Sequence, residues 1–67
     1  MTRDLPIRIA TVRRFDQTVR ALDEARRFAH ALGNDRACAI ATENRDVARR
    51  LHLQAVADAL AAGWVLS

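Results

Sequence analysis

The chain opens with a short stretch in which apolar and polar residues alternate. Residues 5–9 read Leu-Pro-Ile-Arg-Ile, and alternation around β-branched side chains is typical of a half-buried strand. The proline suits the start or the edge of a strand, where its missing N–H is not needed. We therefore predict a strand over residues 5–9.

Residues 11–21 fit two structures. Residues 12–15 can continue the first strand, and residues 15–21 can form a second strand that completes a β-hairpin, with Phe15 and Val19 on one face. Alternatively, Asp16 can cap a helix that begins at Gln17. The pattern leaves both open.

The next segment is a clear amphipathic helix. At 100° per residue, one arc holds its apolar side chains, namely Ala21, Leu22, Ala25, Phe28, Ala29 and Leu32. Val19 projects outside this arc, so we place the start of the helix near Leu22 or Asp23. Gly33 and Asn34 end it, because both tolerate the left-handed conformation of a helix C-cap.

A second helix is expected near the C-terminus, between two short apolar segments. Residues 37–41 are apolar and suit a buried strand, and residues 64–66 suit a short strand or an anchoring hook. Thr42 or Asn44 can cap a helix that runs to about Ala62, with Gly63 as its terminator.

The second helix carries apolar residues on two sides. One side holds Val47, Ala48, Leu51, Ala55, Ala59 and Ala62, and nearly opposite lie Leu53, Val56 and Leu60. With Trp64, the latter group forms a predicted partner-binding surface, made of Leu53, Val56, Leu60 and Trp64. The alternative is a break near His52 that folds both groups into one core.

These elements predict one small α+β domain over residues 1–67: an N-terminal strand or β-hairpin, then two helices. A chain of this length buries only about 60% of its unfolded surface, and its single cysteine, Cys38, excludes an internal disulfide. The lone thiol fits a reducing cytoplasm, and no apolar run approaches a membrane span. Association with another protein is the expected supplement to the core.

Charge adds a second hypothesis. All eleven basic residues are arginines, against eight acids, and several follow an aspartate by four residues, the favoured order for helical ion pairs. The net charge of +3 resides in residues 1–15, which contain Arg3, Arg8, Arg13 and Arg14. These four could bind nucleic acid or another anion, or protect an edge strand from aggregation.

Candidate chemistry is sparse. Cys38 lies among apolar residues, which favours a buried thiol over a reactive one, and His30 and His52 are expected at the surface or its boundary. The sequence has no closely spaced ligand pair for a metal and no glycine-rich phosphate loop. We expect no enzyme activity, no cofactor and no metal.

Two partial resemblances add context. Residues 6–9 and 15–25, with the passage Thr18-Val19 and then Glu24-Ala25, resemble the opening of domain-of-unknown-function family 982, small uncharacterised alphaproteobacterial proteins. The resemblance implies an N-terminal hairpin that passes into a helix, and no activity. Residues 45–51 and 56–60 are similar to a bacterial helix-turn-helix, but the segment between them is too short for the turn.

The sequence thus favours a non-enzymatic protein-binding domain, acting as a homodimer or as a subunit of a larger assembly in the cytoplasm. A nucleic-acid-binding regulator with a basic N-terminal strand is the alternative.

Overall fold

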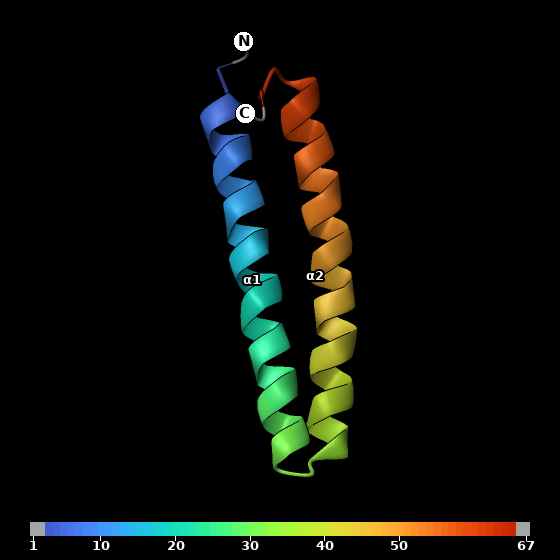
Figure 1. Cartoon of the computed structure of the whole chain (residues 1–67). Helices are drawn as coiled ribbons and strands as arrows, with labels where there is room; N and C mark the ends of the chain where they lie inside the picture. Colours follow the sequence, from blue (N-terminus) through green and yellow to red (C-terminus); the bar gives the residue numbers. More distant parts are fainter. Residues whose placement is uncertain (1–2, 66–67) are drawn as a thin grey trace.

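The computed structural model describes residues 3–65, which form an antiparallel hairpin of two long helices (Figure 1). Helix α1 spans Leu5–Ala31 and helix α2 spans Asp35–Ala61, with 27 residues in each. The helices lie side by side in a rod with extents of 48 × 17 × 16 Å. The start of α1 and the end of α2 therefore share one end of the rod, opposite the turn.

The predicted α+β fold is wrong. Within residues 3–65 the structure has no strand, and the segments 5–9, 15–21 and 37–41 are all helical. Residues 64 and 65 are irregular, and residue 66 of the predicted tail strand lies outside the described residues. Helix α1 therefore begins at Leu5 rather than near Leu22. Residues 11–21, for which the sequence allowed a strand or a helix, are helical.

The packing side of α1 explains this result. One row of its buried and half-buried positions recurs at alternating spacings of three and four residues, the pattern of two helices coiled about each other. This row consists of Leu5, Arg8, Val12, Phe15, Val19, Leu22, Arg26 and Ala29. Because Arg8 and Arg26 occupy two of its positions, the row does not stand out as an apolar stripe. The short alternation at residues 5–9 then resembles a strand.

Local chemistry in α1 also permits a helix. Pro6 lies in the first turn, where its missing N–H removes no helical hydrogen bond. The hydroxyls of Thr11 and Thr18 donate to the carbonyl oxygens of Ile7 and Arg14, one turn earlier, at 3.0 and 2.9 Å. The two hydroxyl groups thus find hydrogen-bond partners within the helix itself.

The packing side of α2 has the same spacing but much smaller side chains. It consists of Cys38, Ala41, Arg45, Ala48, His52, Ala55, Ala59 and Ala62. Alanine lets two helices approach to the short end of the usual interaxial range, about 8 Å. Val12 of α1 forms a buried cluster with Ala55 and Ala59, and Phe15 is among the partly buried residues packed against it.

The face that the sequence predicted as the inner side of the first helix is not the side that packs against α2. Ala29 is buried and Leu22 half-buried, but Ala21 and Ala25 are exposed. Phe28 and Leu32 are also exposed, at 69% and 68%, whereas Val19 is half-buried in the packing row.

Helix α2 also differs from its prediction in its start and its continuity. Asn34 caps it, accepting a hydrogen bond from the Ala37 backbone N–H at 3.1 Å. Thr42 instead lies inside the helix and donates to the Cys38 carbonyl oxygen. The helix runs unbroken through His52, so a break there is wrong and the turn of a helix-turn-helix does not form.

Both helices end at the glycines, as the sequence predicted, and both ends have the same hydrogen-bond motif. The Gly33 N–H donates to the His30 carbonyl and the Asn34 N–H to the Ala29 carbonyl, which is the Schellman arrangement. The Gly63 and Trp64 N–H groups repeat it at the end of α2. Gly33 and Gly63 have φ values of 71° and 109°, the conformation this motif requires.

Candidate protein-binding surface

The two long sides of the hairpin can be told apart by the residues that flank the packing rows. Residues seven apart occupy the same side of a packed helix, so Thr11, Thr18 and Ala25 follow one flank of α1. Thr11 borders the same concavity as Asp58 of α2, so the α2 row through Asp58 lies on that side too. Asp23 marks the opposite flank.

The side marked by Thr11 and Asp58 is uncharged over the half of the rod nearest the turn. We define this uncharged face as Thr18, Ala21, Ala25, Phe28 and Leu32 of α1 with Ala37, Ile40, Asn44, Val47 and Leu51 of α2. Its five large apolar side chains are between 43% and 69% exposed. A continuous apolar surface of this kind is typical of a protein contact site.

The opposite side carries an ion-pair cluster around Asp23. Its carboxylate contacts Arg26 at 3.2 Å and Arg27 at 3.0 Å within α1, and Arg45 of α2 at 3.0 Å. The hydrogen bond from Arg45 is the main cause that lowers the pKa of Asp23, against a smaller opposing effect of desolvation. The same bond raises the pKa of the Arg45 guanidinium.

Arg45 lies at the centre of this cluster, within the packing row of α2. Its side chain is 19% exposed and also contacts Asp46 at 3.2 Å. Its Nε is buried and has no hydrogen-bond partner among the described residues. The Asp23–Arg45 ion pair connects the two helices, and its contact requires the register that the hairpin has.

The spacing of acids and arginines predicted most of the other ion pairs. Asp4–Arg8 and Asp16–Arg20 form as expected, at 2.8 and 3.3 Å. Asp46 pairs with Arg45, its neighbour in sequence.

The four residues of the predicted partner surface do not form one exposed surface. Val56 and Trp64 are half-buried and pack against the Val12 cluster, so they belong to the hairpin's own core. Leu53 and Leu60 are 63% and 43% exposed on the outside of α2. We call these two the Leu53 patch.

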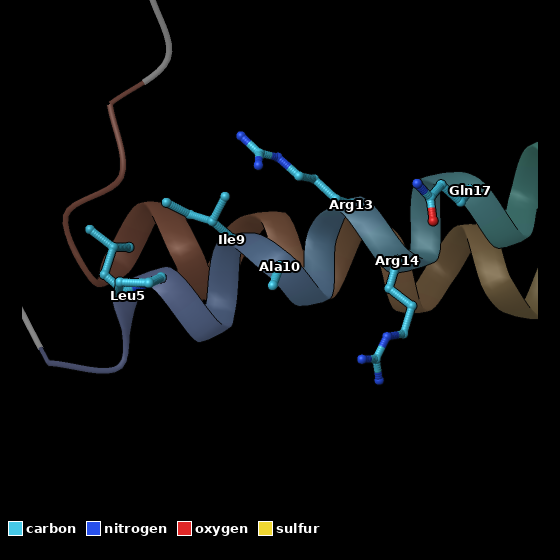
Figure 2. A pocket seen from close by; sticks show the side chains of 7 residues that line it. Leu5, Ile9, Ala10, Arg13, Arg14 and Gln17 are labelled. Atoms are coloured by element: carbon cyan, nitrogen blue, oxygen red, sulfur yellow. The ribbon is translucent and has the colours of Figure 1, made fainter.

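The predicted basic residues lie at the N-terminal end of α1 and are not gathered on one surface. Arg8 pairs with Asp4, and Arg3 precedes the helix. Arg13 and Arg14 line a shallow concavity of about 600 Å³ with Leu5 and Ile9, but Figure 2 shows their guanidinium groups projecting away from each other. The basic N-terminal strand of the nucleic-acid hypothesis is therefore replaced by a helix with divergent arginines.

Cys38 is a free, half-buried cysteine in the packing row of α2. Within residues 3–65, no group of three or more His, Cys, Asp or Glu side chains is placed to hold a metal ion.

Neither helix of the described chain is long and apolar enough to cross a membrane.

No family model, curated protein or solved structure matches the chain. The resemblance to family 982 therefore stays an expectation, and the N-terminal hairpin that it implied is not present in residues 3–65.

Sequence reasoning missed the uncharged face. Phe28 and Leu32 were assigned to the inner side of the first helix, and Val47 and Leu51 to that of the second. The available signal was charge rather than hydrophobicity, because no Arg, Asp or Glu occupies the ten positions of this face. The positions without charge can be assigned to one face only when the spacing of the packing rows is known.

Proposed function

We propose that the chain is a non-enzymatic association module whose helical hairpin completes its core by binding another copy of itself. The observation that supports it is the imbalance between inner and outer surfaces. The buried residues are mainly alanines, and among the described residues no large side chain is fully buried. Within residues 3–65, in contrast, nine large apolar side chains are exposed.

The energetic consequence follows from side-chain size. Burying a Leu, Ile or Phe side chain contributes about 1.5–3 kcal/mol, and alanine contributes much less. Two helices with an alanine seam therefore stabilise each other weakly. Covering the exposed apolar side chains in a complex supplies the missing stabilisation.

The proposal keeps the reducing cytoplasm as the compartment, since Cys38 is the only cysteine of the sequence. It also keeps protein, rather than nucleic acid, as the partner. The uncharged face extends over both helices, whereas the side chains of Arg13 and Arg14 point in different directions (Figure 2).

Thermal unfolding at different protein concentrations tests the proposal. Association stabilises the folded state by mass action, so we expect the midpoint of the helical transition to rise as the concentration is raised about a hundredfold. A midpoint that is independent of concentration would contradict self-association.

A further inference from the structure

We infer that the uncharged face binds the uncharged face of a second copy, so that two hairpins form a four-helix bundle with both turns at one end. The inference rests on the proposed self-association and adds which face is buried and how the copies are oriented. In this arrangement α1 of each copy lies against α2 of the other.

The distribution of charge selects this face. A symmetric dimer buries the same patch on both copies, so a residue near the symmetry axis lies close to the same residue of the other copy. The uncharged face brings no like charges together. The opposite side would bring two Asp23 clusters together, each with three arginines around one aspartate.

The area of the molecule fits one such interface. The hairpin exposes 5242 Å², whereas a compact monomer of 7.5 kDa exposes about 4,250 Å². The excess of roughly 1,000 Å² is close to the 800 Å² or so that each partner buries in a stable complex. One long side of the rod over its whole length, 48 Å by 17 Å, presents about that area, so the interface includes the uncharged face and continues toward the open end.

The orientation follows from the register of the hairpin. Asp23 and Arg45 are in contact, so Ala21 and Val47, each two residues away toward the open end, lie at the same level of the rod. With both turns at one end, the small Ala21 of one copy faces Val47 of the other. By the same register Ala25 lies level with Glu43 and Asn44 of the other copy, and Phe28 lies level with Ile40.

The remaining charges on this side agree with the same orientation. Toward the open end it carries Arg14 and Asp58, which lie about one helical turn apart along the rod, because Thr11 and Asp58 border one concavity. Aligned copies bring Arg14 of one within reach of Asp58 of the other. Copies with their turns at opposite ends would separate these charges.

Sedimentation equilibrium of two matched variants tests the buried face. Val47→Glu and Leu53→Glu each place a carboxylate at an exposed apolar position of α2. We expect Val47→Glu to weaken dimerisation on the order of a hundredfold, because the symmetric interface buries the charge twice. Leu53→Glu is expected to change it by less than about threefold.

The outcomes separate the two proposals. A wild-type chain that stays monomeric would overturn the proposed function itself. A wild-type dimer that Leu53→Glu dissociates and Val47→Glu does not would leave self-association standing and move the interface to the Leu53 patch. Circular dichroism at high concentration checks that both variants stay helical, and a Val47→Gln variant that dimerises excludes loss of folding as the cause.

A charge rescue tests the orientation. Ala21→Arg alone should weaken dimerisation, and combining it with Val47→Glu should recover at least about tenfold over Val47→Glu alone, because the two charges then pair between copies. Recovery of dimerisation in the double variant would confirm that the turns of both copies lie at one end of the bundle. A double variant weaker than either single variant would overturn the orientation.

Discussion

Five of the eight positions in the packing row of α2 are alanines, and Ala59 is the most deeply buried of them, with no exposed surface. It lies in one cluster with Val12 and Ala55. A larger side chain at Ala59 would have to displace its neighbours, because the two helices are in contact through this cluster.

Ala59→Leu should therefore destabilise the hairpin by about 1–3 kcal/mol, since the added methylenes force the helices apart. Ala57→Leu is the matched control, because Ala57 is exposed on the same helix, and we expect a change within about 0.5 kcal/mol. Urea unfolding of both variants measures the difference. Equal effects would show that the alanine seam is not closely packed.

Gly33 offers a second test at the residue scale. Its φ of 71° requires a left-handed backbone, and an added Cβ would have no atom within 4 Å. Gly33→Ala should cost about 1 kcal/mol through backbone strain alone, and Gly33→Asn should cost less, because asparagine tolerates this conformation. Thermal unfolding compares the two. An alanine variant as stable as the wild type would contradict the assigned turn.

At the scale of the elements, the ion-pair cluster links α1 to α2 and makes the pairing depend on pH. The Arg45 hydrogen bond lowers the pKa of Asp23 below its ordinary value of 3.8. The folded state therefore binds that proton less well than the unfolded state. The stabilisation is complete above this ordinary value and is lost as the pH falls through the lowered one.

Asp23→Asn should thus lower the unfolding midpoint at neutral pH and reduce the loss of stability that acid causes in the wild type. Asp16→Asn is the control, because the ion pair that Asp16 forms within residues 3–65 is with Arg20, one turn away in the same helix. Thermal scans between neutral pH and pH values below 3.8 measure both. An acid sensitivity in Asp23→Asn as large as that of the wild type would contradict the role of the cluster.

The sequence allowed the helix ends to be predicted, but not the extent of α1. Gly33 and Gly63 mark the ends correctly because a positive φ leaves few alternatives. The first half of α1 was not predicted to be helical. The physical reason is that Arg8 occupies a position that a typical coiled coil fills with an apolar residue. Arg45 and His52 hide the packing row of α2 in the same way.

The same difficulty explains the candidate surface. Val56 and Trp64 were predicted to bind a partner, but the register of the two helices places them against the Val12 cluster. Which apolar residues remain outside depends on how two helices pair, a long-range property that helical periodicity alone does not contain. Phe28 and Val47 could therefore be identified only from the assembled hairpin.

At the scale of the whole molecule, the hairpin is a 48 Å rod with a narrow alanine core and one side that is uncharged over the half nearest the turn. These features lead to one claim, that the rod is half of a bundle. The small core, the elongated shape and the distribution of surface charge support this proposal, because a second rod would cover the uncharged face.

The most direct measurement is the mass of the wild-type chain by sedimentation equilibrium over a range of micromolar concentrations. We predict a mass that rises from the 7.5 kDa of one chain to twice that value and stops there, as expected for a closed two-fold dimer. A mass that stays at one chain throughout, with full helicity, would contradict the account.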